Sequence, residues 1–240
     1  MPRLALMIDL ERCTGCKSCE AACKSEHALG PTERHNRVVW LGSKLEENSD
    51  NNQALDFLAL ACQHCERPAC VRACPVSPKA ISKNKETGVV TVNEDACVGC
   101  GECVTACPYG AMGFDPDGRH AVKCDLCSDR RAEGAATTAC AAVCPTKAIT
   151  FGPRDELLKT TEANNREMIK NDPFLLGPAT IYLDRITNKQ EKFDAADRNS
   201  PKVIDSFTNI SIDDTVFPYG HDREDREITR IESGGCNICF

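Results

Sequence analysis

The sequence predicts an α+β fold in which short strands and short helices surround repeated groups of cysteines, followed by a C-terminal extension. Three observations predict it. Sixteen of the eighteen cysteines fall into four groups of four before residue 150. Apolar segments of strand length border these groups. After residue 150 the cysteine groups stop, and the chain is polar and weakly patterned from about residue 185.

Two segments repeat one pattern, in which a short strand and a turn precede the first cysteine of a group. Residues 5–9 lead to Cys13, and residues 89–92 lead to Cys97. Three of the groups end in Cys-Pro, and each of these endings is followed by a segment that turns apolar. These segments contain Ala80-Ile81, Ala111-Met112 and Ala148-Ile149. The repeat is therefore the main organising feature of the chain.

Other elements lie between and after the cysteine groups. Residues 31–54 are polar and predict a loop insertion, with one strand at residues 38–41. Residues 154–170 are rich in helix formers and predict a helix that ends at Asp172-Pro173. Residues 179–183 predict a further strand.

The composition limits how such a fold is stabilised. The chain has 240 residues, enough for one large domain or two small ones. Hydrophobic residues make up 41%, but this figure includes the cysteines, and aromatic residues are only 5%. The apolar core is therefore thin, and bound metal is expected to stabilise the fold by coupling its binding to folding.

The four cysteine groups have spacings that suit iron–sulfur clusters. The groups are Cys13, Cys16, Cys19, Cys23 (x2, x2, x3); Cys62, Cys65, Cys70, Cys74 (x2, x4, x3); Cys97, Cys100, Cys103, Cys107 (x2, x2, x3); and Cys124, Cys127, Cys140, Cys144 (x2, x12, x3). A cubane core needs four thiolates, and a C-x2-C-x2-C loop reaches three of its irons. In such runs the fourth cysteine, followed by proline, binds the other cluster of a pair. The sixteen cysteines predict four [4Fe–4S] clusters.

Zinc is the alternative metal. Structural zinc sites use two C-x2-C pairs with a long spacer, and the gap between Cys127 and Cys140 is by itself typical of them. The first and third groups instead place four cysteines within eleven residues, which favours clusters. The fourth group is assigned to iron by its neighbours and by its Cys144-Pro145 ending.

Four segments carry a resemblance to a known family. They are Cys62-Gln63-His64-Cys65-Glu66-Arg67-Pro68-Ala69-Cys70, Cys97-Val98-Gly99-Cys100-Gly101-Glu102-Cys103, Cys107-Pro108-Tyr109-Gly110 and Lys123-Cys124-Asp125-Leu126-Cys127. Residues 4–150 resemble the four-cluster ferredoxin-type subunits of multi-subunit oxidoreductases, which include the iron–sulfur subunits of the dimethyl sulfoxide reductase, polysulfide reductase and formate dehydrogenase families. The resemblance implies two nested bacterial dicluster-ferredoxin-like units. They are an outer discontinuous unit (1–30 with 120–150) and an inner unit (55–119), with the loop insertion at 31–54 and a partner-docking extension at 151–240.

The resemblance also implies how the groups share clusters, the first with the fourth and the second with the third. The implied ligand sets are Cys13, Cys16, Cys19 with Cys144; Cys124, Cys127, Cys140 with Cys23; Cys62, Cys65, Cys70 with Cys107; and Cys97, Cys100, Cys103 with Cys74. One departure is that Lys24, not proline, follows Cys23. Cys236 and Cys239 form half a metal site outside these sets, and could clip a partner's metal, form a disulfide or stay unligated.

Charge and motifs exclude several classes of protein. The formal charge is −7, and four clusters on sixteen thiolates would bring it to about −15. Such a chain is a poor nucleic-acid binder and suits partners with a basic docking face. The cations Lys123, Arg130 and Arg131 flank the fourth group, where they would raise a cluster's potential or form a solvated face. No phosphate loop, nucleophilic triad or dinucleotide fingerprint is present, so no reaction on an organic substrate is expected in this chain.

The function that the resemblance implies is single-electron transfer through four clusters. The expected partners are a catalytic molybdopterin or tungstopterin subunit and a second redox partner, such as a membrane quinone-reactive subunit. A free polyferredoxin is the alternative, although the last 90 residues argue against it. A structural zinc protein is the third hypothesis.

The expected location follows from the start of the chain and from the thiols. The residues before Cys13 leave no room for a secretory signal, and no apolar run has the length of a membrane helix. Cluster cysteines must be kept reduced for assembly, which favours the cytoplasm. The resemblance implies a second possible compartment, the periplasm, which the folded chain would reach by co-export with a partner. In either compartment the chain is expected to be soluble, or peripheral on a membrane through that partner.

Overall fold

The structure is a computed structural model that describes residues 2–31, 33–40, 57–115, 117–169 and 171–184. The described residues combine short helices with one three-stranded sheet and three two-stranded sheets. This mixture confirms the predicted α+β class. In the part that is described, no helix is both long and apolar enough to cross a bilayer.

The elements alternate closely along the chain. The strands are β1 (Leu4–Asp9), β2 (Asn36–Trp40), β3 (Phe57–Ala61), β4 (Ile81–Lys83), β5 (Val90–Val92), β6 (Met112–Asp115), β7 (His120–Lys123), β8 (Ile149–Pro153) and β9 (Ile181–Leu183). The helices are α1 (Ser18–Glu26), α2 (Ala69–Ala73), α3 (Glu102–Ala106), α4 (Ser128–Ala132), α5 (Ala139–Val143) and α6 (Arg154–Ala163). Five of these six helices have nine residues or fewer, so tertiary contacts rather than helix propensity must hold them.

The three-stranded sheet brings together distant parts of the chain. Strand β1 lies in its centre, antiparallel to β8 and parallel to β9. Successive side chains of β1 point to opposite faces, so Leu6 and Ile8 join the main core while Ala5 packs in a separate cluster with Leu157 of α6. Both faces are therefore covered, which explains why β1 is apolar almost throughout.

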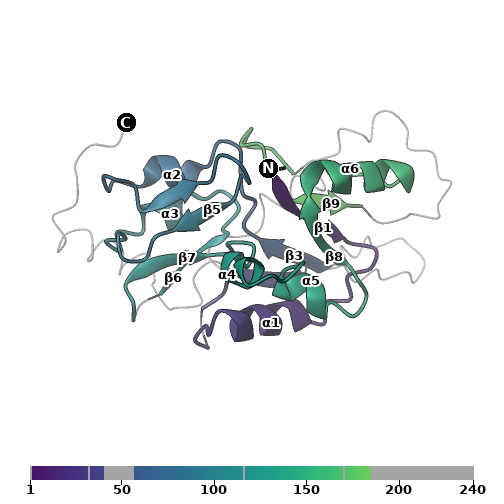
Figure 1. Ribbon diagram of the computed structural model, residues 1–240, viewed down its shortest axis with the longest axis horizontal. Coiled ribbons are helices and arrows are strands. Elements are labelled where there is room, and N and C mark those ends of the chain that lie inside the picture. The colour runs from purple at the N-terminus through teal and green to yellow at the C-terminus, as the bar shows by residue number, and fades with distance from the viewer. Residues whose placement is uncertain (1, 32, 41–56, 116, 170, 185–240) are drawn as a thin grey trace, which may run out of the picture.

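Two hairpins form the opposite end of the molecule. Strands β4 and β5 pair antiparallel, as do β6 and β7, and helices α2 and α3 pack against each other beside them. Figure 1 shows these elements at the left and the β8-β1-β9 sheet with α6 at the right. Their core contains Ile81, Val90 and Met112 together with several cysteines. Cysteines are thus part of the packing at both ends.

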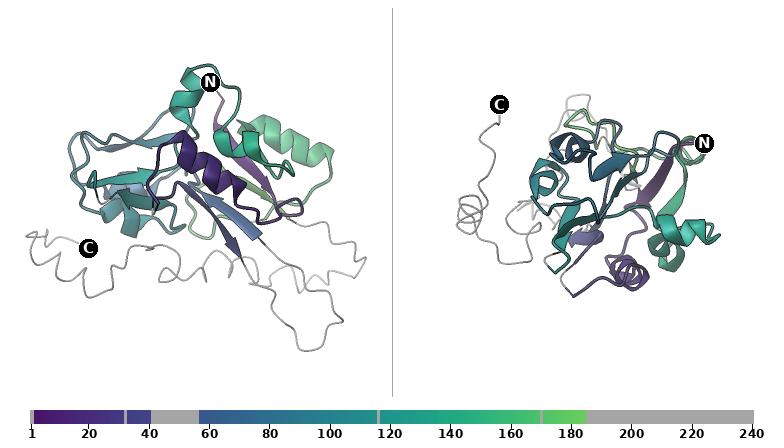
Figure 2. Two further views of the ribbon diagram at one scale, coloured as in Figure 1. Left: turned by 90° about the horizontal axis from the view of Figure 1, so that it is seen from below. Right: turned by 60° about the vertical axis from the view of Figure 1, so that its left-hand side comes forward.

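The central part consists of β3, the antiparallel strand β2, and helices α1 and α5. Leu58 and Leu60 of β3 are almost fully buried. Helices α1 and α5 pack against each other although more than 100 residues separate them. In the left-hand view of Figure 2, α1 lies between the hairpins on the left and α6 on the right.

The four predicted strands are present, but the predicted helix is shorter than expected. Strands are found at the positions predicted from residues 5–9, 38–41, 89–92 and 179–183. The helix predicted over 154–170 ends at Ala163. After it, Asn165 has a φ of 50°, and the chain then returns to the sheet, where the N–H of Ile169 donates to the carbonyl of Tyr182 at 2.9 Å. The free edge of β9 offers backbone partners that a longer helix could not use.

Asp172 and Pro173, where this helix was predicted to end, lie beyond its last residue, Ala163. The carboxylate of Asp172 instead accepts hydrogen bonds from the N–H groups of Leu176 and Gly177 at 2.7 and 3.0 Å. Residues 41–54 of the predicted loop insertion lie outside the described residues, as do Cys236 and Cys239.

Candidate iron–sulfur cluster sites

The sixteen predicted cysteines all lie in the described residues, and each is a free thiol. The structure brings them together in four sets. We name them site A (Cys13, Cys16, Cys19, Cys144), site B (Cys23, Cys124, Cys127, Cys140), site C (Cys62, Cys65, Cys70, Cys107) and site D (Cys74, Cys97, Cys100, Cys103). The names follow the ligand sets that the family resemblance implies, which stay a prediction.

Site A is a cavity lined by all four of its cysteines. Its remaining wall is largely apolar and includes Val38, Ala59 and Ile149. The loop before α1 carries Gly15 at a φ of +69°, where a Cβ would come within 2.4 Å of the ring of Phe57. Glycine is therefore required at this position both for the turn and for the close approach of the loop to β3.

Site D repeats this plan at the other end of the molecule. One cavity is lined by its four cysteines and by apolar side chains of the two hairpins. The loop before α3 turns at Gly99 and Gly101, with φ of +71° and +74°. The carbonyl oxygen of Arg119 lies 2.4 Å from where a Cβ on Gly99 would stand. Sites A and D therefore share a glycine-turned loop that presses against a neighbouring segment.

Sites B and C are dense groups of sulfur atoms. All four cysteines of site B are buried, and in site C two are buried and two, Cys65 and Cys107, are half-buried. Burial raises the pKa of Cys65 in site C to about 12, and the neighbouring Cys62, Cys107 and Cys70 raise it further. In site B, burial raises the pKa of Cys124, and Cys23 and Cys140 add to this rise. The thiols of each set thus lie close enough to repel one another's negative charge. Such thiols become ligands only when a cation offsets that charge.

Backbone N–H groups point at the sulfur atoms of the three Cys-Pro endings. Since proline has no N–H, the donors come from residues further along the chain. They are Ala148 N–H to Cys144 Sγ at 3.2 Å, Ala111 N–H to Cys107 Sγ at 3.5 Å, and the N–H groups of Val76, Ala80 and Ile81 around Cys74 Sγ. All-sulfur ligand sets, apolar walls and N–H donors to sulfur together fit iron–sulfur clusters at these sites.

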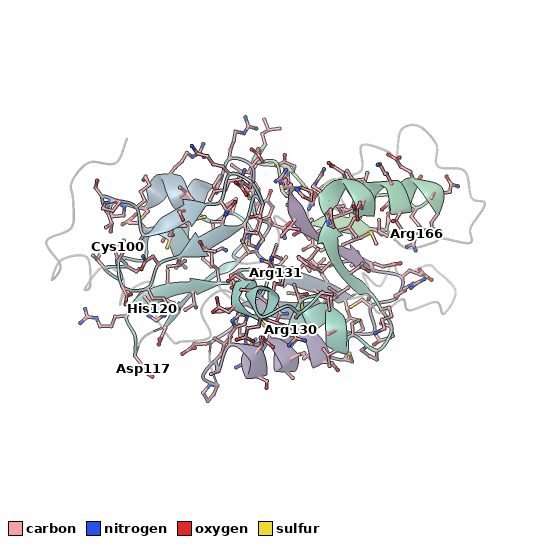
Figure 3. All side chains as sticks on the ribbon, in the orientation of Figure 1. Cys100, Asp117, His120, Arg130, Arg131 and Arg166 are labelled. Carbon is pink, nitrogen blue, oxygen red and sulfur yellow. The ribbon has the colours of Figure 1, made fainter. Side chains whose placement is uncertain are left out.

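The four sites follow one another in the order A, B, C, D. Thiols of successive sites interact electrostatically through Cys19 with Cys140, Cys124 with Cys62, and Cys70 with Cys103. Among the sixteen cysteines, only Cys16 of site A and Cys100 of site D are exposed. All four cysteines of site B are buried. In Figure 3, Cys100 lies at the left-hand margin of the molecule, far from Arg166.

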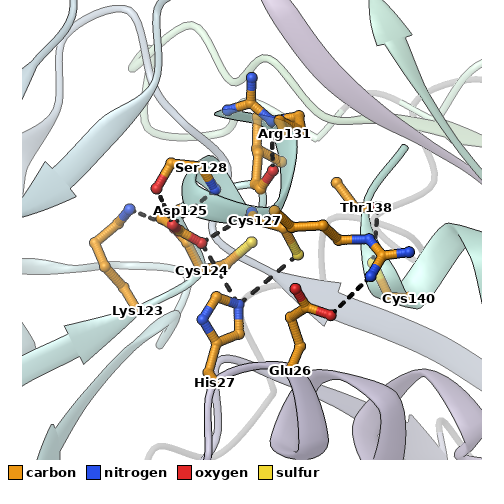
Figure 4. A network of polar contacts seen from close by, with 12 residues as sticks. Glu26, His27, Lys123, Cys124, Asp125, Cys127, Ser128, Arg131, Thr138 and Cys140 are labelled. Atoms are coloured by element: carbon orange, nitrogen blue, oxygen red, sulfur yellow. Dashed lines mark hydrogen bonds and ion pairs between the residues drawn. The ribbon is translucent and has the colours of Figure 1, made fainter. Parts of the chain in front are cut away.

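Site B has a polar network that the cysteine motifs did not predict (Figure 4). His27 Nε2 lies 3.7 Å from Cys127 Sγ and 3.6 Å from Asp125 Oδ1. Asp125 in turn accepts a hydrogen bond from the Cys127 N–H at 2.9 Å. The spacing from Cys23 to His27 is one helical turn, which would have placed both on one face of α1.

A second imidazole, that of His35, lies close to site B. The ring centroids of His27 and His35 are 4.7 Å apart, and one nitrogen of each ring lies within 4.8 Å of the Cys23 sulfur. Burial, with the nearby His27, lowers the pKa of His35 to about 4, so its ring is neutral at pH 7. Site B therefore differs from the other sites in having two imidazoles beside its thiols.

The three cations around the fourth cysteine group have different environments. Lys123 is buried, and its Nζ donates hydrogen bonds to the carbonyl oxygens of Val90 and Cys124. Arg130 forms an ion pair with Glu26 at 3.0 Å, which joins α4 to α1. Arg131 donates to the carbonyl of Leu126 at 2.8 Å. Only Lys123 of the three is fully enclosed.

Comparison with known families gives two matches. A model of 4Fe-4S dicluster domains matches residues 53–154, and a model of 4Fe-4S binding domains matches residues 4–25. The two ranges together contain every cysteine of sites A to D.

Several known proteins are similar over most of their length. The B subunit of anaerobic dimethyl sulfoxide reductase from Escherichia coli (strain K12) is 42% identical over 156 residues, which are 63% of this chain and 74% of that protein. The thiosulfate reductase electron transfer subunit of Salmonella typhi is 32% identical over 187 residues, 78% of this chain and 95% of that protein. The B subunit of polysulfide reductase from Wolinella succinogenes is 35% identical over 150 residues, 62% of this chain and 76% of that protein. The chain thus belongs to the family of 4Fe–4S electron-transfer subunits that includes these reductase subunits.

Proposed function

We propose that this chain carries single electrons through four [4Fe–4S] clusters, held at sites A to D, between a catalytic subunit and a second redox partner. The observation that carries the proposal is the order of the sites. Neighbouring thiol sets form a continuous row, and its two end sites each have one exposed cysteine, Cys16 and Cys100. A row with both ends at the surface suits a protein that accepts electrons at one face and donates them at another.

The clusters would supply one-electron oxidation and reduction, and the chain's own residues would control it. The sixteen cysteines of sites A to D would be the iron ligands. Burial of the four cysteines of site B would exclude water from its cluster, and the N–H groups at the Cys-Pro endings would stabilise negative charge on sulfur. The loop formed by each C-x2-C-x2-C run would hold three ligands of an end site.

The proposed domain organisation is the nested one. All ligands of sites C and D come from residues 62–107, inside the inner unit at 55–119. The ligands of sites A and B come from residues 13–23 and 124–144, in the outer unit formed by 1–30 and 120–150. Residues 31–54 are the insertion, and the extension 151–240 docks a partner. Within that extension, residues up to 184 contribute α6 and β9 to the packing around β1.

The proposed partners follow from the relatives. Those relatives are named as chains or electron-transfer subunits of reductases, so a large catalytic subunit is expected here as well. We propose that it carries a molybdopterin or tungstopterin cofactor, and that a membrane quinone-reactive subunit completes the complex. The chain would then lie in the cytoplasm, or in the periplasm by co-export, and would be peripheral on the membrane through its partner.

Iron and acid-labile sulfide analysis of the full chain, purified without oxygen, tests the number of clusters. We expect about sixteen iron atoms per chain, four for each cluster. A double variant, Cys236→Ala with Cys239→Ala, is the control and should keep the same iron content because these residues lie outside sites A to D. About twelve iron atoms or fewer in the unsubstituted protein would contradict the proposal.

Co-purification tests the subunit role. We expect the chain to elute together with a large subunit that contains a pterin cofactor. Elution alone, at the mass of the single chain and with a full iron content, would show a free carrier instead.

A further inference from the structure

Lys123, at the end of β7, is a buried lysine whose ammonium group donates hydrogen bonds to backbone carbonyls. Its exposed fraction is 4%. Its Nζ donates to the carbonyl oxygen of Val90 on β5 and to that of Cys124, the latter at 2.5 Å. No carboxylate of the described residues lies within ion-pair distance of it. Burying an ammonium without a counter-charge is costly, so this charge must be offset by another negative group.

Hydrogen bonds link Lys123 to cysteines of two different sites, which would be thiolate ligands of the clusters. On one side its Nζ donates to the carbonyl oxygen of Cys124, a ligand of site B, at 2.5 Å. On the other side it donates to the carbonyl oxygen of Val90, whose own N–H donates to His64 Nδ1 at 3.0 Å, and the His64 N–H donates to Sγ of Cys62, a ligand of site C, at 3.4 Å. Figure 4 shows Lys123 beside Cys124 on the side away from Arg131. The ammonium therefore lies where the two central sites meet.

We infer that Lys123 is a fixed positive charge shared by sites B and C, and that it raises the reduction potentials of the clusters held at both. This inference rests on the proposed function, because it takes the cysteines of sites B and C as cluster ligands. Reduction adds one negative charge to a cluster, and a nearby buried cation stabilises that charge. The effect weakens with distance, so it is smaller at the surface sites A and D.

The test is a redox titration of the full chain, with the reduced clusters followed by electron paramagnetic resonance. Lys123→Met removes the charge and keeps the length of the side chain, while Lys123→Gln also keeps an N–H donor. In both variants we expect the reduction equilibrium constants of two of the four clusters to fall about tenfold or more. A tenfold change corresponds to about 59 mV for a one-electron couple.

Lys79 provides a matched control. Its Nζ also donates to the carbonyl of a ligand cysteine, Cys74 of site D, at 2.6 Å, but Lys79 is exposed. Water screens an exposed charge, so Lys79→Met should leave all four potentials within about twofold of their original equilibrium constants. Lys123→Arg keeps the buried charge and should preserve the potentials.

The outcomes separate this inference from the proposed function. A low iron content in the unsubstituted protein contradicts the four-cluster proposal itself. A full iron content with unmoved potentials in Lys123→Met or Lys123→Gln, or a shift in one cluster alone, overturns only the role of Lys123. If both uncharged variants lose iron, retention of iron and potentials by Lys123→Arg supports the need for the charge, and loss in all three variants overturns it.

Discussion

At the scale of single residues, the ion pair between Asp9 and Arg166 stabilises the C-terminal end of β1. Arg166 Nη1 lies 2.8 Å from Asp9 Oδ2, and Nη2 lies 2.9 Å from Oδ1, so the contact is bidentate. Both side chains are largely buried, and Nη2 also donates to the carbonyl of Asp184 at 2.6 Å. The pair therefore ties the segment after α6 to the two strands β1 and β9.

We expect Arg166→Ala to lower the free energy of unfolding by about 3 kcal/mol, because it leaves the buried carboxylate of Asp9 without its main partner. Arg12→Ala is the matched control. Arg12 contacts the same carboxylate at 3.5 Å, but its side chain is 58% exposed, so a loss below about 1 kcal/mol is expected. Denaturant unfolding of the cluster-loaded protein measures both, and equal losses would show that the buried pair has no special role.

Among the secondary-structure elements, the loops before α1 and α3 decide whether cysteines can surround a cluster. These loops turn through positive φ at glycines, and at Gly99 the turn also presses against the backbone of Arg119. At Gly101 the conformation is similar, with a φ of +74°, but a Cβ would meet nothing within 4 Å. The two positions separate the cost of the turn from the cost of a clash.

We predict that Gly99→Ala lowers the iron content by about four atoms per chain, because the loop must shift away from Arg119 and displaces Cys97 and Cys100 of site D. Gly101→Ala should cost only about 1 kcal/mol of strain and keep its iron. Iron analysis of the two variants compares them directly. Full iron in Gly99→Ala would mean that the loop relaxes without disturbing its ligands.

The bounds of the strands and helices show why sequence patterns predicted the secondary structure only in part. The strand predicted at residues 5–9 is present because its apolar pattern is local and both of its faces are covered. The helix predicted over 154–170 stops at Ala163 because the chain turns back to hydrogen-bond the edge of β9, a strand that lies further along the sequence. Helix propensity carries no information about that partner.

Across the molecule, the end sites and the central sites differ in their access to water. Site A and site D each have an exposed cysteine, whereas site B has none and site C has none that is fully exposed. A reagent in solution should therefore meet the two ends of the row first.

We expect an iron chelator with a mild oxidant to remove the iron in two phases. About half of the iron, from sites A and D, should leave in the fast phase, and the remainder should leave more slowly as the protein opens. Absorbance and protein-bound iron followed over time measure this. Loss of all iron in a single phase would indicate that exposure of Cys16 and Cys100 does not control access.

The metal chemistry of this protein could be predicted from the order of its residues. Cysteine spacing is a local property, and sixteen thiols in four groups, three of which end in Cys-Pro, together indicate iron–sulfur clusters. The family resemblance then implied which groups share a cluster, and similarity to reductase subunits assigned the chain to electron transfer.

The surroundings of the sulfur atoms, in contrast, depend on tertiary packing. The approach of His27 to Cys127 across 100 residues, the enclosure of Lys123 between sites B and C, and the exposure of Cys16 and Cys100 all result from how distant segments pack. Burial and electrostatic environment are properties of that packing, and spacing along the chain does not contain them. The motifs therefore identify the metal chemistry, and the packing determines the order of the sites and the charges that act on each.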